Sequence, residues 1–293
     1  MNCTVYYDIE GKSPLLLYMT FRQTSTMSAY NHLPTVDLSL VSNNQHVYIL
    51  KDTGVNVTND YGTPNLLFFY FIPFLPDDRK PDLEALQDEI QSWNAWELGQ
   101  TEVQVRHRIA DGSLPSDDAT ASRVKRTNYR AKVVDHLREV SETTWLVKNA
   151  DSHSGPFSAD VKVAEVNGKI RDVLKDFYGQ ESLPAQFSVI LNIITDLIAS
   201  QPDADNKYLF TYVYYYYDVD QKVFKPDIRQ LQFSVTQTAV EGEKDTVKLD
   251  ISNLNHVYSL LREKWRSVRH EAEEIIEAGE KIRKDMALNF YFS

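Results

Sequence analysis

The segment 208–217 (YLFTYVYYYY) constrains the fold of this chain more than any other. Aromatic and β-branched residues favour strands, in which successive side chains point to opposite faces of a sheet. Alternation places Phe210, Tyr212, Tyr214 and Tyr216 on one face, and Leu209, Val213, Tyr215 and Tyr217 on the other. Because one face must pack on a core, the segment predicts a sheet that lies under helices. A stacking platform for bases or sugars stays open as the alternative.

Further strands are predicted on both sides of this segment. Short apolar runs are separated by turn residues in the first 75 positions, and residues 228–238 alternate strictly between apolar and polar. The run 66–71 is apolar throughout, which is typical of a strand buried on both faces. The predicted strands besides 208–217 are 15–20, 36–41, 47–50, 66–71, 228–238 and 246–251.

Apolar residues spaced three and four apart predict several helices. Leu83, Leu86, Ile90 and Trp93 mark a helix over about 83–98, which we expect to end at Gly99. Residues 101–110 fit a strand as well as a helix. Further helices are expected over about 117–149, 159–178 and 184–200.

The most regular pattern predicts a long helix over about 253–286. Its apolar residues are spaced four and three apart for more than four heptads, as in a coiled coil. Two explanations stay open. The helix packs along the protein's own helix 117–149, or it forms a coiled coil with another chain. In the second case the partner-binding residues are Tyr258, Leu261, Trp265, Val268 and Ile275, with Trp265 as the anchor.

These elements predict an α+β protein in which an antiparallel sheet is covered by helices, two of them long (about 117–149 and 253–286). A chain of 293 residues fits one large domain or two small ones. The polar segment 149–156 (NADSHSGP) is the best linker in the chain, so a subdomain boundary near 150–156 stays open. We predict a single domain over residues 1–293.

Composition and motifs argue against nucleic-acid binding and against the metal and phosphate sites that a sequence can reveal. Acidic residues number 42 and basic residues 31, and a net charge of −11 makes nucleic acid an unfavourable partner. The single cysteine, Cys3, can form neither an internal disulfide nor a thiolate metal cage. Gly11-Lys12-Ser13 lacks the preceding glycine of a phosphate-binding loop. His270-Glu271 lacks the second histidine of a helical zinc site.

We therefore predict no catalytic, metal-binding or cofactor-binding residues and no cofactor. A pair of carboxylates brought together only by the fold would not be visible in the sequence, so a hydrolase without a recognisable motif stays open. We expect the protein not to be an enzyme.

Two apolar segments bear on membranes. Residues 66–76 (LLFFYFIPFLP) and 187–199 (FSVILNIITDLIA) are too short to span a bilayer as helices. They fit a core strand and a core helix, or segments that move into lipid. The membrane-seeking residues in the second reading are Phe187, Val189, Ile190, Ile193, Ile194 and Leu197. Without a signal peptide the expected location is cytoplasmic, with release by a non-classical route left open.

Residues 158–238 resemble one known family. They run from a helix (IRDVLKDFY) through an amphipathic helix (AQFSVILNIITDLIAS) to an aromatic strand (KYLFTYVYYYYDV), a turn and an alternating strand (LQFSVTQT). This order is similar to part of the Cyt-type single-domain α/β cytolysins and covers under a third of the chain. The resemblance implies helices over a sheet and a molecule that rearranges at a membrane, and it implies no particular functional residue.

Two functional hypotheses follow. In the first, the protein is non-enzymatic and acts by binding another protein or by self-association. In the second, it is a membrane-active, toxin-like protein that rearranges to bind lipid.

Overall fold

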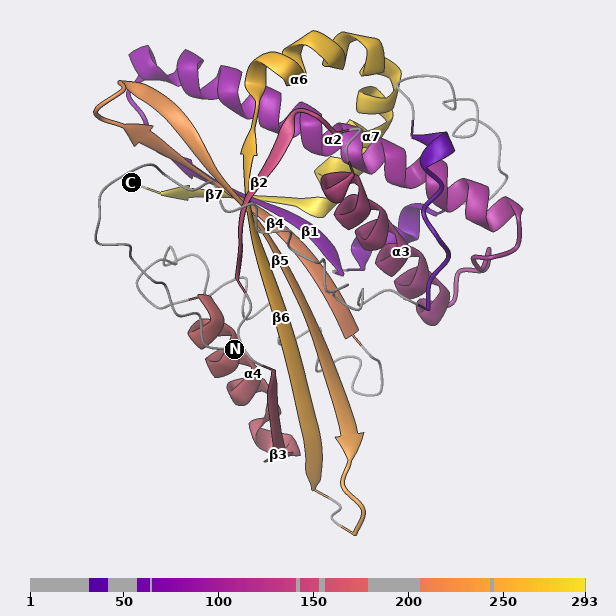
Figure 1. Ribbon diagram of the computed structural model, residues 1–293. Coiled ribbons are helices and arrows are strands. Elements are labelled where there is room, and N and C mark those ends of the chain that lie inside the picture. Colours follow the sequence, from indigo (N-terminus) through magenta and orange to yellow (C-terminus); the bar gives the residue numbers. More distant parts are fainter. Residues whose placement is uncertain are drawn as a thin grey trace, which may run out of the picture.

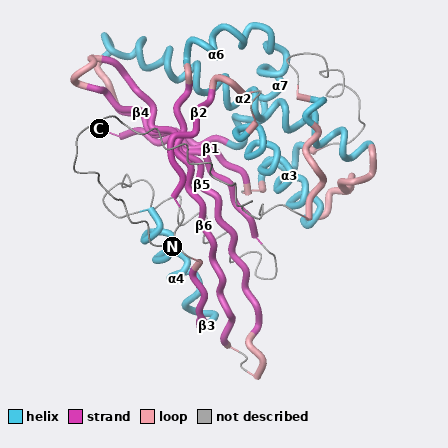
Figure 2. The backbone as a smooth tube through the Cα atoms, viewed as in Figure 1, coloured by secondary structure: helices cyan, strands magenta, loops and turns pink. Residues whose placement is uncertain are grey.

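A computed structural model gives the fold, and it describes residues 32–41, 57–63, 65–140, 143–152, 156–178, 206–242 and 245–292. In this part of the chain, a seven-stranded sheet carries helices on its faces (Figures 1 and 2). The strands are β1 (Leu66–Pro73), β2 (Leu146–Ser152), β3 (Phe157–Lys162), β4 (Asn206–Asp218), β5 (Val223–Ala239), β6 (Thr246–Leu260) and β7 (Ala287–Phe292). The helices are α2 (Lys80–Ala110), α3 (Thr120–Glu139), α4 (Val166–Tyr178), α6 (Arg262–Arg269) and α7 (Glu273–Met286). Short 3-10 turns are η1 (Leu38–Leu40), η2 (Thr58–Gly62), η3 (Asp77–Arg79), η4 (Val163–Glu165) and η5 (His270–Ala272).

The sheet is mixed rather than purely antiparallel. Its order is β2-β6-β5-β4-β1-β7, and β3 pairs with the far part of β6. Pairs within β2–β6–β5–β4 are antiparallel, whereas β1 runs parallel to both β4 and β7. The reason lies in β1, which is buried over nearly its whole length. A strand covered on both faces and reached through helical connections suits parallel pairing.

Two cores form, one on each face of the sheet. Helices α2, α3, α6 and α7 cover one face, and α4 covers part of the other. The alternation predicted for 208–217 is confirmed, because Leu209, Val213 and Tyr215 lie in the first core, and Phe210 and Tyr212 in the second. The aromatic strand thus serves packing on both faces, which leaves little of it for stacking on a ligand.

The long helix over 253–286 was the largest wrong prediction. Residues up to Leu260 continue strand β6, and helix begins only at Arg262, with η5 separating α6 from α7. Leu254 and Tyr258 are four residues apart, and because this spacing is even, the two side chains also share one face of a strand. Strand pairing decides between the two periods, because β6 pairs with β5 from Val247 to Tyr258.

Three other boundaries also differ from prediction. The helix expected over 117–149 ends at Glu139. Residues from Leu146 onward form β2 instead, because they pair with β6. The helix expected over 159–178 begins at Val166, because the preceding residues pair with β6 as β3. The strand expected over 36–41 is the turn η1, in which Asp37 accepts a hydrogen bond from the Ser39 N–H at 3.0 Å. The expectations for 1–31, 42–50 and 184–200 lie outside the described residues.

Gly99 does not end its helix. Instead α2 continues through the ambiguous stretch 101–110, and Gly99 lies where α7 crosses it. A Cβ added at Gly99 would overlap the Ile275 carbonyl oxygen, and one added at Gly279 would overlap that of Ala95. The two helix backbones are therefore in direct contact, and only glycine fits at these two positions.

We predict that Gly279→Ala destabilises the protein by about 2–4 kcal/mol, because a methyl group must push two backbones apart. The matched control is Gly168→Ala in α4, where an added Cβ meets nothing within 4 Å. That change should leave stability unchanged or raise it by about 0.5 kcal/mol. Denaturant unfolding of both variants checks the difference, and equal stability of the two would contradict the backbone contact.

Candidate functional site

The residues predicted to bind a partner mostly face inward. Trp265 is fully buried, and Tyr258 and Ile275 are nearly so. Val268 is partly buried against the same core, and Leu261 is the most exposed of the five at 36 %. Trp265 and Ile275 lie against α2, so a partner could reach them only if α6 and α7 left that helix.

Trp265 is an anchor within the protein's own helical layer. Its ring lies 5.3 Å from that of Trp145 and 6.3 Å from that of Trp96, and its Nε1 donates to the Ser92 hydroxyl at 2.9 Å. Arg262 and Arg266 flank it in α6, and both bind the carboxylate of Glu89 in α2. From Trp265 onward, the regularly spaced apolar residues therefore pack within this chain, against α2 and not against the helix expected over 117–149.

Of the two predicted membrane-seeking segments, the structure describes only the first, residues 66–76. Phe187, Val189, Ile190, Ile193, Ile194 and Leu197 lie outside the described residues. Residues 66–72 form the buried strand β1, but Phe74 directly after it is 66 % exposed. No helix in the described ranges is both long enough and apolar enough to cross a bilayer.

A buried polar network joins the helices to the sheet. Arg138 of α3 donates to both carboxylate oxygens of Glu97 in α2, at 2.6 and 2.7 Å. Its remaining nitrogen donates to the Thr211 hydroxyl in β4 at 2.9 Å and to the Gln230 side-chain oxygen in β5 at 2.8 Å. All four side chains are buried. One guanidinium therefore holds two helices and two strands together.

Asp135 extends this network toward the surface. Its Oδ1 accepts hydrogen bonds from the side-chain amides of Gln230, at 2.8 Å, and Gln232. Burial raises the pKa of this carboxyl from 3.8 to about 6, although the Gln230 amide opposes the shift. Glu139 raises the pKa further, and the charge of Arg138 lowers it. Folding therefore disfavours the charged form of Asp135 relative to its protonated form.

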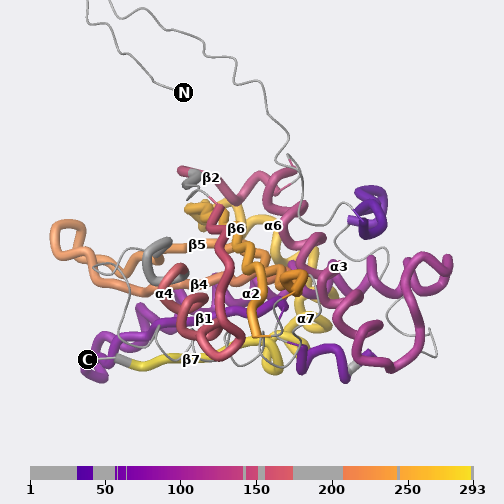
Figure 3. The backbone as a smooth tube through the Cα atoms, turned by 90° about the horizontal axis from the view of Figure 1, so that it is seen from below, coloured from indigo at the N-terminus to yellow at the C-terminus, as the bar shows by residue number. Residues whose placement is uncertain are grey.

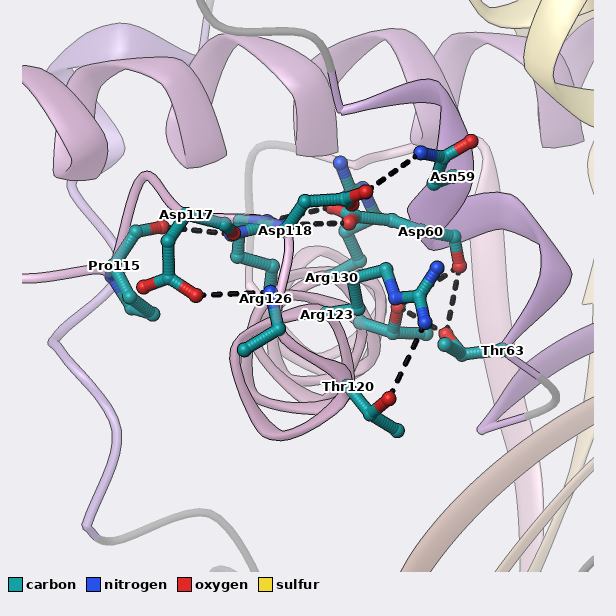
Figure 4. A network of polar contacts seen from close by, with 12 residues as sticks. Asn59, Asp60, Thr63, Pro115, Asp117, Asp118, Thr120, Arg123, Arg126 and Arg130 are labelled. Carbon is teal, nitrogen blue, oxygen red and sulfur yellow. Dashed lines mark hydrogen bonds and ion pairs between the residues drawn. The ribbon is translucent and has the colours of Figure 1, made fainter.

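A second buried network centres on Asp60 of η2 (Figure 4). Arg126 donates to both oxygens of its carboxylate, at 2.8 and 2.7 Å, and Arg130 donates to one of them at 2.8 Å. Arg130 also binds Glu102 of α2 at 2.5 Å. These buried charges tie η2, α3 and α2 into one unit.

In the two networks, the fully buried carboxylates of Asp60, Glu97 and Glu102 are each bound by an arginine. Within the described ranges, no group of three or more His, Cys, Asp or Glu side chains could hold a metal ion. An open hollow of about 650 Å³ lies over α2, α6 and α7. Its arginines are occupied in holding α6 on α2, with Arg269 paired to Asp88 at 2.8 Å.

The exposed apolar residues point to a different site. Ten large hydrophobic side chains are exposed in the described part of the chain, and five of them gather at one end of the sheet. We call this set the aromatic end; it consists of Phe74, Tyr216, Val219, Val223 and Tyr291. The sequence gives no sign of it, since the five come from three separate segments.

Strand directions explain why these segments meet. β1 and β7 run parallel to β4, so the ends of all three strands lie together, beside the turn from β4 to β5 (Figure 1). Phe74 stacks on Tyr291, with ring centroids 5.7 Å apart. Val219, in the turn, is 75 % exposed. The aromatic end is therefore made of loop and strand ends that project from the sheet.

Charges around the aromatic end are paired locally. Asp77 binds Lys80 at 2.5 Å, and Asp218 binds Lys225 at 2.6 Å. The guanidinium of Arg79 lies 4.7 Å from the centre of the Tyr217 ring. The surface surrounding the exposed rings thus carries both signs of charge in contact with each other.

Comparison with known proteins gives only weak likenesses. No protein-family model matches the chain, and no curated protein matches it. The solved structure of the Evf virulence factor is similar over 80 % of this chain and 94 % of that chain, with 13 % identity and a TM-score of 0.40. A delta-endotoxin is similar over 67 % of this chain and 82 % of that chain, with 10 % identity and a TM-score of 0.31. Neither structure is named as a Cyt-type cytolysin.

We predict that Asp60→Asn lowers stability by about 3 kcal/mol, because two buried guanidinium groups lose their shared countercharge. Asp118→Asn is the matched control, since Asp118 accepts only a surface hydrogen bond from Asn59 at 2.9 Å. It should change stability by less than about 0.5 kcal/mol. Urea unfolding of the two variants at neutral pH measures both, and similar losses would argue against the network.

Asp135→Asn should stabilise the protein at neutral pH. A carboxyl whose folded-state pKa is raised costs stability above that pKa, and the cost disappears as pH falls below the unfolded value. Asparagine keeps an oxygen for Gln230 and Gln232 but carries no charge. We expect a gain of about 1–2 kcal/mol at pH 7.5 and none at about pH 3. A loss of stability at pH 7.5 would show that the charged form is the favoured one.

Proposed function

We propose that the protein acts without chemistry of its own, by binding the surface of a zwitterionic lipid bilayer through the aromatic end. The observation that carries this proposal is the gathering of Phe74, Val219 and Tyr291 with two further exposed apolar side chains at one end of the sheet. Scattered exposed apolar residues are normal in proteins, whereas clustered ones mark binding sites.

The types of side chain favour lipid over a protein partner. Tyrosine and other amphipathic aromatic rings prefer the boundary between headgroups and acyl chains. Burying the exposed part of Phe74 alone contributes about 1–2 kcal/mol. A bilayer also needs no matching groove, and the aromatic end projects rather than forming one.

Charge favours neutral lipid over anionic lipid. The net charge of −11 opposes approach to an anionic surface. Around the aromatic end, Lys80 and Lys225 are each paired with an aspartate, which reduces the positive charge that could offset this repulsion. Zwitterionic headgroups, which carry both signs themselves, fit such a surface.

We predict that the protein co-floats with phosphatidylcholine vesicles and that 0.5 M salt releases little of it, since apolar burial is not screened. Val219→Asp should weaken binding about tenfold or more, because a charge must then enter the interface. Val163→Asp is the matched control, as Val163 is 57 % exposed at η4, outside the aromatic end.

Three results would count against the proposal. Equal effects of the two substitutions would remove the aromatic end from the binding surface. Binding only to anionic vesicles, reversed by salt, would indicate an electrostatic contact elsewhere. A protein that ignores every vesicle but captures a soluble protein would favour the protein-binding hypothesis for the same surface.

A further inference from the structure

The two edges of the sheet differ in charge. One edge is formed by β2 and β3, which carry Lys148, Asp160 and Lys162. The other is β7, which in the described part of the chain pairs only with β1 and lies outermost opposite β2 (Figure 3). Its sequence, ALNFYF, contains no Asp, Glu, Lys or Arg.

An uncharged edge strand is unusual in a stable fold. Edge strands expose unpaired N–H and C=O groups, and proteins normally protect them with lysine, proline or inward-pointing charges. The first edge follows this rule, and β7 does not. Leu288, Asn289 and Tyr291 are also exposed, so the strand is accessible to another chain.

We propose that β7 pairs with β7 of a second copy of this chain, antiparallel, so that the two sheets become one. A second copy fits better than a foreign strand because the strand is complementary to itself. The chain as a whole is strongly acidic, so two copies repel each other. The electrostatic cost of a contact between them is lowest at an edge that carries no charged side chain.

The faces of β7 limit the possible registers of this pair. Ala287 packs on the core under α2 and α7, whereas Phe290 packs on the opposite core, so odd-numbered positions share the first face and even-numbered positions the second. Opposed residues of one continuous sheet must lie on the same face when the two-fold axis is perpendicular to it. This condition is met when the axis passes through a residue of β7, and we place the axis at Asn289, near the middle of the strand.

This register matches side chains in kind and size. On one face, Leu288 lies opposite Phe290 of the second copy, an apolar pair. On the other face, the small Ala287 lies opposite the large Tyr291. On the axis, two Asn289 amides can donate to and accept from each other.

Cysteine cross-linking tests the register in a Cys3→Ser background, which has no other thiol. Directly opposed strand residues have Cα atoms about 4.5–5.5 Å apart, within disulfide range, whereas diagonal ones are about 7–8 Å apart. Under mild oxidation Asn289→Cys should form a covalent dimer, and Leu288→Cys should not. Cross-linking of Leu288→Cys as fast as Asn289→Cys would overturn the register.

Sedimentation measures the association itself. A single short strand pair should give a weak dimer, with a Kd of about tens of micromolar. Asn289→Lys places two like charges on the axis and should weaken the dimer at least about tenfold. Asn149→Lys, an exposed change on the β2 edge, is the matched control and should have no effect.

Far-UV circular dichroism and melting temperature should be unchanged in both lysine variants, so that a lost dimer is not a lost fold. A protein that stays monomeric at several hundred micromolar, or equal effects of the two lysines, would overturn the proposal. Because no lipid is present in these experiments, their outcome is independent of whether the aromatic end binds a bilayer.

Discussion

The burial of Arg138 between the helices and the sheet is the constraint on which the rest of the arrangement depends. A buried guanidinium is tolerable only when its hydrogen bonds are satisfied, because removing one partner leaves a charge uncompensated in a medium of low dielectric. Glu97, Thr211 and Gln230 supply those partners from α2, β4 and β5. Their positions therefore fix how α2 and α3 lie on the sheet, more specifically than apolar packing alone would.

The helical layer is held as one unit by two further contacts. Asp60 joins η2 to α3, and Gly99 and Gly279 bring α2 and α7 into backbone contact. Apolar surface that the layer does not cover is then left at fixed places, the aromatic end and the β7 edge. Both proposed functions follow from where this layer stops, and neither requires a residue from the buried networks.

The sequence could predict those elements whose apolar pattern fits only one type of secondary structure. The aromatic strand 208–217 was correct because its period of two is unbroken, and 66–71 was correct because a short continuous apolar run fits a doubly buried strand. The helix over 253–286 was wrong because Leu254 and Tyr258 satisfy both periods, and only pairing with β5 decides between them. The aromatic end was not predictable, since parallel strand order brings Phe74, Val219 and Tyr291 together from distant segments.

The two proposed surfaces meet at Tyr291, and their geometry sets a limit on joint use. This residue lies next to the last residue of β7, at the aromatic end, and in the proposed pair it lies opposite Ala287 of the second copy. Antiparallel pairing points the two β7 strands in opposite directions, so the aromatic ends of a dimer face away from each other. One flat bilayer can then contact only one of them. Binding of both copies to the same bilayer requires them to separate, so on one bilayer lipid binding and the proposed strand pairing compete, and by linkage such a surface shifts the equilibrium toward monomers.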